Sequence, residues 1–205
     1  MHIVDRIVEQ NLGVYRASPN RLREDVTQEA QVASDYRGRL AYELLQNADD
    51  AMEGAASRRD HVKFVLTDDA LWMANNGRPL SDADVQGLCG LGASSKIDAK
   101  GNKRASIGHK GLGFKSVLEI TDRPAAISEG IAFELSERTA RERVSDVFRE
   151  LGHNVPNSYP IMRFPSIVEF EHLEWQKLKE DGFTTAFRFP FKPEMTDERQ
   201  QRLAD

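Results

Sequence analysis

The residues with the clearest chemical potential form a glycine-rich stretch from Gly108 to Gly113. Its glycines at 108, 111 and 113 let the backbone turn with positive φ and come close to a bulky group. From Phe114 the apolar spacing predicts a short helix, so the loop would present unpaired N–H groups at a helix N-terminus, where anions such as phosphate bind. Lys110 and Lys115 add positive charge. Because glycine turns before helices are common, this signal needs partners elsewhere in the chain.

A second set of polar side chains lies on the helix predicted for residues 35–54, the strongest in the chain. Glu43 and Asn47 are one turn apart, and Asp50 follows along the same stripe. Beside a magnesium nucleotide, the Asn47 oxygen could bind the cation and Glu43 could deprotonate a water near the γ-phosphate. The alternative, polar residues that face solvent, is the commoner case for such a helix considered alone. The neighbouring apolar stripe, which would face a sheet, consists of Leu40, Leu44, Leu45, Ala48 and Met52.

Two strands are predicted after this helix, at residues 61–67 and 70–74, and the second leads into a turn with Asn75 and Gly77. The glycine can bring the backbone close to a flat ligand. Ser81, with an aspartate three residues later, predicts a capped helix start. The other predicted elements are two helices within 1–34, strands at 125–128 and 131–135, a surface helix at 139–151, a short strand at 160–164, a strand at 182–191 and a helix from about 196.

Composition and charge narrow the class of protein. The 205 residues are 40% hydrophobic and 30% charged, as in a soluble globular protein. No apolar run approaches the ~20 residues of a membrane helix and the first residues lack a signal-peptide pattern, so we expect a cytoplasmic protein without membrane contact. Cys89 is expected to be a small buried apolar group, and the histidines lack zinc-ligand spacing.

Charge and glycine are concentrated in one segment. Residues 96–115 carry a net charge of +5 in a chain of −5, which favours a local anionic ligand and argues against direct nucleic-acid binding. Half of the 14 glycines lie between residues 87 and 113, a segment predicted to form a mobile lid over the site.

Four blocks in a fixed order resemble the GHKL ATPase superfamily, which includes the gyrase B subunit, the ninety-kilodalton heat-shock chaperones, MutL, MORC proteins and histidine kinases. The blocks are ELLQNADDA from Glu43, NNG from Asn75, the glycine stretch through Ser116, and Thr184-Thr185. ELLQNADDA, NNGRPL, GASSK and IGHKGLGFKSV look closest to sacsin-like and NO VEIN-like ATP-binding domains. The resemblance implies a two-layer α/β (α+β) sandwich of the Bergerat type, with a mixed, largely antiparallel sheet and a glycine-rich lid over ATP.

The resemblance also implies roles for single residues. Glu43 would be the general base and Asn47 the ligand of Mg²⁺, the expected cofactor. Asn75 stands where most members have an Asp that accepts a hydrogen bond from the adenine amino group; an Asn oxygen can still accept this bond, and its NH₂ could donate to a ring nitrogen. Thr185, or Thr184 one position earlier, would support the adenine end. The other implied nucleotide contacts are Asp50, Gly77, Ser95, Lys96, Gly108, His109, Lys110, Gly111, Leu112, Gly113, Phe114 and Lys115.

The implied function is an ATP-hydrolysing module that couples lid closure to an ATP-dependent homodimer or to downstream domains of a longer chaperone-like, nucleic-acid-associated or defence-associated protein. Its regions would be a helical arm at 1–34, a GHKL-type ATP-binding domain at 35–193 and, at 194–205, the start of a helix that leads to a further region. In the superfamily a cation from the following domain often completes the γ-phosphate site, so we expect weak hydrolysis from these residues alone. Two alternatives stay open: a nucleotide-sensing module without appreciable turnover, and a histidine-kinase-type phosphotransferase.

Overall fold

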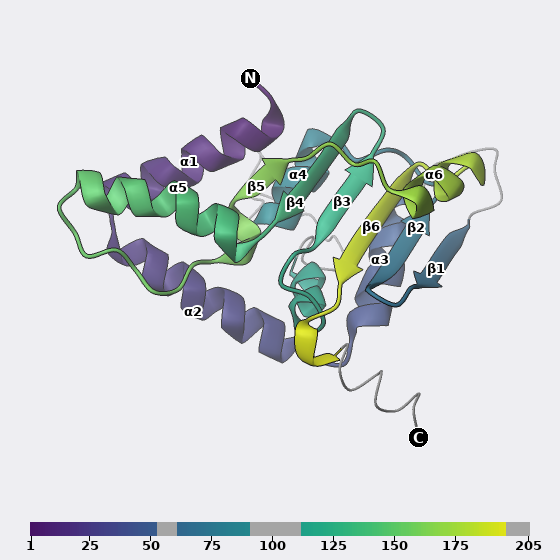
Figure 1. Cartoon of the computed structure of the whole chain (residues 1–205), viewed down its shortest axis with the longest axis horizontal. Helices are drawn as coiled ribbons and strands as arrows, with labels where there is room; N and C mark the ends of the chain where they lie inside the picture. The colour runs from purple at the N-terminus through teal and green to yellow at the C-terminus, as the bar shows by residue number, and fades with distance from the viewer. Residues whose placement is uncertain (53–60, 91–111, 196–205) are drawn as a thin grey trace, which may run out of the picture.

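Six strands form one open antiparallel sheet in the computed structural model, which describes residues 1–52, 61–90 and 112–195 (Figure 1). Their spatial order is β1-β2-β6-β3-β4-β5, and every neighbouring pair is antiparallel. The last strand in sequence, β6, therefore lies between two hairpins that precede it. The strands are β1 (Val62–Leu66), β2 (Ala70–Asn75), β3 (Ala125–Ser128), β4 (Ile131–Leu135), β5 (Pro165–Ile167) and β6 (Thr185–Pro190).

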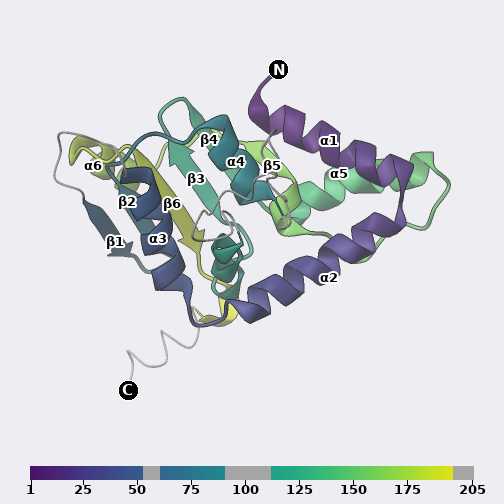
Figure 2. The same cartoon turned by 180° about the vertical axis from the view of Figure 1, so that it is seen from behind.

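Helices α3 and α4 and the 3₁₀ helix η1 lie across one face of the sheet (Figure 2). The short helix α6 packs on the opposite face through Leu178. Beyond β5, α1 packs against both α2 and α5 (Figure 1). This arrangement confirms the α+β, two-layer architecture predicted above. The helices are α1 (Ile3–Ala17), α2 (Asn20–Asp35), α3 (Leu40–Met52), α4 (Asp82–Cys89), η1 (Gly113–Glu119), α5 (Glu137–Glu150), η2 (Ile161–Arg163) and α6 (Leu173–Glu180).

Alternation along the strands builds the main core. Met73 of β2 is paired with Phe187 of β6, which is paired in turn with Ala126 of β3. These side chains point to the same face and pack against Leu44 of α3 and Phe114 of η1. The rings of Phe114 and Phe187 are 5.4 Å apart. Burial of one such side chain contributes about 1.5–3 kcal/mol, so this contact holds η1 firmly on the sheet.

Buried polar contacts fasten the two N-terminal helices to the rest of the chain. The Tyr15 hydroxyl of α1 donates to the carboxylate of Asp25 on α2 at 2.8 Å, and both side chains are fully buried. The Arg163 guanidinium of η2 lies 3.2 Å from the same carboxylate. Glu29 of α2 accepts the first two backbone N–H groups of η2, each at 2.8 Å. α1 and α2 are therefore tied to η2 by charge-assisted contacts as well as by apolar packing.

The helix predicted for residues 35–54 is confirmed but begins later than expected. α3 starts at Leu40, because Gly38 has a φ of +75° in the turn that precedes it. One member of its predicted apolar stripe is wrong: Leu45 is 46% exposed, whereas Leu44 and Ala48 are buried in the core. A difference of one residue changes the direction of a helical side chain by about 100°, which periodicity alone resolves poorly at the edge of a stripe.

Two predictions in the C-terminal half are corrected. Residues 160–164 were expected to form a strand, but residues 161–163 form η2 and the strand β5 starts at Pro165. Helix α6 was not predicted, since only Leu178 of its eight residues is buried and the apolar spacing is weak. The N-terminal helices and both hairpins are confirmed. The helix predicted from about 196 lies outside the described residues.

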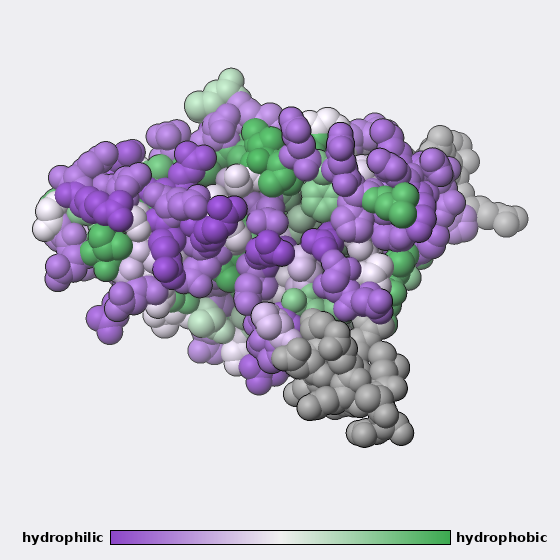
Figure 3. Space-filling model, in the orientation of Figure 1, coloured by the Kyte–Doolittle hydropathy of each residue, from purple (hydrophilic) through white to green (hydrophobic). Residues whose placement is uncertain are grey.

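Helix α5 has a buried side as well as the expected exposed one. Val144, Val147 and Phe148 pack into a second hydrophobic cluster with Val8 and Tyr15 of α1. On the described part of the face in Figure 3, hydrophilic side chains predominate and hydrophobic ones form small separate groups. One side of α5 therefore packs against α1, and its other side carries charged residues.

Candidate functional site

Helix α3 carries three of the polar side chains for which the sequence predicts chemistry. Leu44 and Ala48 anchor it in the main core at 1% and 0% exposure. Glu43, Asn47 and Asp50 lie on the adjoining stripe and are half-buried. They therefore lie at the margin of the core, where partly desolvated side chains interact more strongly than they would in bulk water.

Glu43 lies against Gly113, the last glycine of the predicted phosphate loop. A Cβ atom on Gly113 would lie 1.7 Å from Oε2 of Glu43 and 2.5 Å from its Cδ. Only glycine fits there while the carboxylate keeps its position. The fold thus brings a predicted catalytic residue to the end of the glycine stretch, although the two are far apart in the sequence.

The C-terminal end of α3 is held by the turn that follows β2. A Cβ atom on Gly77 would lie 2.6 Å from the carbonyl oxygen of Ala51 and 2.7 Å from its carbon. The backbone N–H of Arg78 donates to the same carbonyl at 2.9 Å. Glycine is needed at position 77 because the backbones of the turn and of α3 approach closely. Helix α3 thus contacts Gly113 near one end and the Asn75–Gly77 turn at the other.

Asn75 is the last residue of β2 and is only 2% exposed. Its Oδ1 accepts a hydrogen bond from the N–H of Gly77 at 3.1 Å. Thr184 closes the turn from the other side, since its N–H donates to the Asn75 carbonyl at 3.1 Å and its hydroxyl donates to the Gly77 carbonyl at 2.6 Å. Thr185 is paired with Asn75 in the sheet. Both threonines of the last block therefore adjoin the turn, in different ways.

Ser128 supports this region without any signal in the sequence. Its hydroxyl is 2.8 Å from that of Thr185 and accepts the backbone N–H of Leu80 at 3.0 Å. Ser128 ends β3, and β3 meets β6 only through long-range pairing. Because its contacts depend on that pairing, no local pattern could have identified it.

Lys115 lies in the protein interior. Its side chain is fully buried and its Nζ donates to the carbonyl of Leu88 on α4 at 2.9 Å. Burial lowers the pKa of Lys115 to about 8, and the neighbouring Cys89 and Glu29 act in the opposite direction. The predicted burial of Cys89 is confirmed, and burial raises the pKa of its thiol to about 12. In this arrangement the Lys115 ammonium links η1 to α4 and is not directed to an open surface.

The other predicted contacts near η1 differ in exposure. Phe114 is buried between Phe187 and Phe189, with ring distances of 5.4 and 6.0 Å. Leu112 is half-buried, and its carbonyl accepts the N–H of Lys115 at 3.0 Å. Most of the predicted lid lies outside the described residues. So do the predicted nucleotide contacts Ser95, Lys96, Gly108, His109, Lys110 and Gly111.

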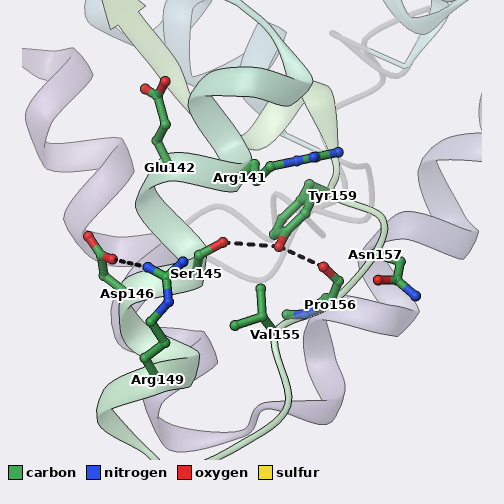
Figure 4. Close-up of a pocket in the computed structure, with 9 residues that line it drawn as sticks. All are labelled: Arg141, Glu142, Ser145, Asp146, Arg149, Val155, Pro156, Asn157 and Tyr159. Atoms are coloured by element: carbon green, nitrogen blue, oxygen red, sulfur yellow. Dashed lines mark hydrogen bonds and ion pairs between the residues drawn. The ribbon is translucent and has the colours of Figure 1, made fainter.

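A hollow of about 520 Å³ lies elsewhere, between α5 and residues 155–159 (Figure 4). Within the hollow, the Tyr159 hydroxyl donates to the Pro156 carbonyl at 2.7 Å and lies 3.1 Å from the Ser145 hydroxyl. Arg149 on its rim is paired with Asp146 at 2.7 Å. None of the predicted site residues lines this hollow, so it is separate from the α3 region.

In residues 1–52, 61–90 and 112–195, no three His, Cys, Asp or Glu side chains gather as a metal cluster would require. Over the same residues, every helix is too short or too polar to cross a bilayer.

Comparison with known proteins identifies the family. The family model of the sacsin domain matches residues 24–205. Protein NO VEIN of Arabidopsis thaliana is 29% identical over an alignment of 156 residues, and the match covers 73% of this chain and 5% of that protein. Human Sacsin is 39% identical over an alignment of 98 residues, and the match covers 42% of this chain and 2% of Sacsin. The chain thus corresponds to a small part of these two relatives. Because the family model covers most of its length, this protein belongs to the sacsin domain family.

Proposed function

We propose that this sacsin domain binds a nucleoside triphosphate with Mg²⁺ and hydrolyses it, with ATP as the substrate implied by the resemblance to the GHKL superfamily. The observation that carries the proposal is the contact between Glu43 and Gly113. A carboxylate at the end of a phosphate-binding glycine loop is close to where an attacking water would be deprotonated.

In the proposed reaction, a water oxygen attacks the γ-phosphorus while Glu43 takes a proton from that water. The bond from the γ-phosphorus to the bridging oxygen breaks, so ADP and inorganic phosphate leave. Asn47, one turn along α3, would offer its side-chain oxygen to Mg²⁺. Mg²⁺ would neutralise charge on the phosphate oxygens, and phosphates and waters would supply most of its ligands.

The proposal extends to coupling with other parts of a longer protein. The chain corresponds to 5% of NO VEIN and 2% of Sacsin, so most of each of those proteins lies outside the matched region. We propose that nucleotide binding is coupled to an ATP-dependent homodimer or to downstream domains. In the GHKL superfamily a cation from the following domain often completes the γ-phosphate site, so we expect slow turnover by the 205 residues alone.

Binding and phosphate release test the proposal separately. Thermal shifts with ATP, ADP and a non-hydrolysable ATP analogue, with and without Mg²⁺, measure binding; a ligand at ~100 times its Kd adds about 2.7 kcal/mol to the free energy of unfolding. We expect Asn47→Ala to abolish the Mg²⁺-dependent part. Glu43→Gln should keep binding and lose about 10²- to 10⁴-fold in turnover. Asp49→Asn removes an exposed carboxylate from the same helix and should change neither.

The outcomes separate the alternatives. Equal phosphate release by Glu43→Gln and the wild type would remove Glu43 from the mechanism. Binding without any phosphate release by the wild type would favour the nucleotide-sensing module. The absence of binding to every nucleotide would refute the proposal as a whole.

A further inference from the structure

One stripe of α5 forms a wall of the hollow beside residues 155–159 (Figure 4). Arg141, Ser145 and Arg149 follow one another at intervals of four residues, so they lie along one side of the helix, and all three line the hollow. The eight residues from the first arginine to the second span about 12 Å of α-helix. The stripe therefore places an arginine at each end and a hydroxyl group between them.

The two arginines are held only weakly by carboxylates of their own helix. Arg141 lies 3.2 Å from Glu137 and Arg149 lies 2.7 Å from Asp146, and the two arginine side chains are 59% and 64% exposed. Exposed ion pairs within one helix contribute little to stability. The Arg141 guanidinium also lies 5.6 Å from the centre of the Tyr159 ring, which keeps it over the hollow. An anionic ligand can therefore replace the helix carboxylates at small cost.

The buried side of the hollow offers hydrogen-bond acceptors. The Tyr159 hydroxyl donates to the Pro156 carbonyl at 2.7 Å, so Ser145 supplies the hydrogen for the 3.1 Å contact between the two hydroxyl groups. Ser145 and Tyr159 are 4% and 5% exposed. Because both hydroxyl hydrogens are engaged, these oxygens can only accept further hydrogen bonds. The hollow thus combines acceptors on its inner side with guanidinium donors at both ends of the stripe.

The wall opposite α5 carries apolar and amide side chains. Val155 is 40% exposed, Pro156 adds an apolar ring, and the Asn157 amide can both donate and accept. The volume of about 520 Å³ is within the range of ~300–1,000 Å³ that is usual for ligand sites. A peptide backbone needs acceptors for its N–H groups and donors for its carbonyls, and this hollow supplies both. A bare anion such as phosphate would use only the arginines.

We propose that the hollow binds an extended peptide segment with two acidic side chains four positions apart and an apolar side chain midway between them. In an extended strand, residues i, i+2 and i+4 point to the same side, and the first and last are about 13 Å apart. This separation matches the ~12 Å between residues 141 and 149 of α5. The acidic side chains pair with Arg141 and Arg149, and the apolar one contacts Val155. No residue of the proposed nucleotide site lines the hollow, so the two proposals are independent.

An NMR titration of the ¹⁵N-labelled 205-residue chain at low salt measures both the affinity and the place of binding. The probe is the acetylated and amidated pentapeptide Glu-Thr-Leu-Thr-Glu. We expect saturable shifts of the amide signals of residues 141–149 and 155–159, with a Kd on the order of 1 mM, and weaker binding at high salt. Glu-Glu-Leu-Thr-Thr has the same composition but presents its acidic side chains to opposite sides. It should bind at least about threefold more weakly.

Variants of α5 test the two ends of the stripe. Arg141→Gln and Arg149→Gln should each weaken binding of the first peptide by at least about threefold, because each removes one charged contact. Arg138→Gln is the matched control. Arg138 is exposed on the same helix and is paired with Glu142 at 3.3 Å, but it does not line the hollow, so binding should not change.

Saturable shifts at the hollow that weaken with either of the first two variants, but not with Arg138→Gln, would support the proposal. Equal weakening by all three variants would overturn it, since the total charge of α5 and not the hollow would then attract the peptide. Equal affinity for the two peptides would overturn the proposed spacing. Shifts centred on another surface, or no saturable shift with about 5 mM peptide, would overturn the site itself. None of these results bears on nucleotide binding.

Discussion

Two glycines contact α3, and the structure predicts losses of stability of different size for the same substitution to alanine. At Gly113 an added Cβ would meet the end of the Glu43 side chain, at 1.7 Å from Oε2. Glu43 is half-buried and can rotate away, at about 0.5–1.5 kcal/mol for a displaced rotamer. At Gly77 the Cβ would meet the Ala51 carbonyl at 2.6 Å, and a backbone in a helix cannot rotate away.

For Gly77→Ala we expect a loss of about 1.5–4.5 kcal/mol, from overpacking at ~1–3 kcal/mol and from weakening of the Arg78 to Ala51 hydrogen bond at ~0.5–1.5 kcal/mol. For Gly113→Ala we expect a loss of about 1 kcal/mol or less. If Glu43 is the general base, Gly113→Ala should nevertheless reduce turnover about as much as removal of Glu43, because the carboxylate is displaced.

Urea unfolding of the single and double variants measures these free energies, and phosphate release measures turnover. The double variant Glu43→Ala/Gly113→Ala gives the decisive comparison, since the alanine at 113 then has no carboxylate to displace. We expect the stability penalty of Gly113→Ala to vanish in that background. A penalty of equal size with and without Glu43, or a loss at Gly113 as large as that at Gly77, would refute the assigned contact.

Three further expectations concern the packing around this region. Phe114→Ala should reduce the free energy of unfolding by about 3–5 kcal/mol in urea, because its ring is buried against two phenylalanines of β6; a loss below ~1 kcal/mol would contradict its place in the core. Ser81→Ala should lower stability by about 1 kcal/mol, since it removes the capping box of α4, whereas a neutral result would argue against that cap. Between about pH 8.5 and 10, Cys89 loses its thiol proton in the unfolded chain but keeps it in the folded protein, so the free energy of unfolding falls as pH rises. Lys115 keeps its proton in the unfolded chain but has lost it in the folded protein, so the free energy of unfolding rises with pH. Each effect changes the free energy of unfolding by ~1.4 kcal/mol per pH unit at most. We therefore expect a nearly flat wild-type profile in this range, a rise with pH for Cys89→Ala and a fall for Lys115→Met, and the same slope in all three proteins would show that neither group titrates as described.

The sequence by itself determined most of the local elements and the family. Apolar periodicity predicts α1, α2 and α3, and the Ser81 cap predicts the start of α4, because these depend on residues a few positions apart. The order of the four sequence blocks led to the sacsin-like assignment that the family comparison supports. Alternating apolar residues likewise predict both hairpins.

Only the tertiary structure decided which side chains meet and which are hidden. Lys115 follows the glycine stretch and was expected to face phosphate, yet packing of η1 turns its ammonium toward Leu88 in the interior. The contact of Glu43 with Gly113 and the hydrogen bonds of Ser128 join segments that are remote in sequence. A repeat of 3.6 or 2 residues states which face of an element is buried, but the identity of the partner across that face depends on strand order and long-range packing, which no local pattern contains.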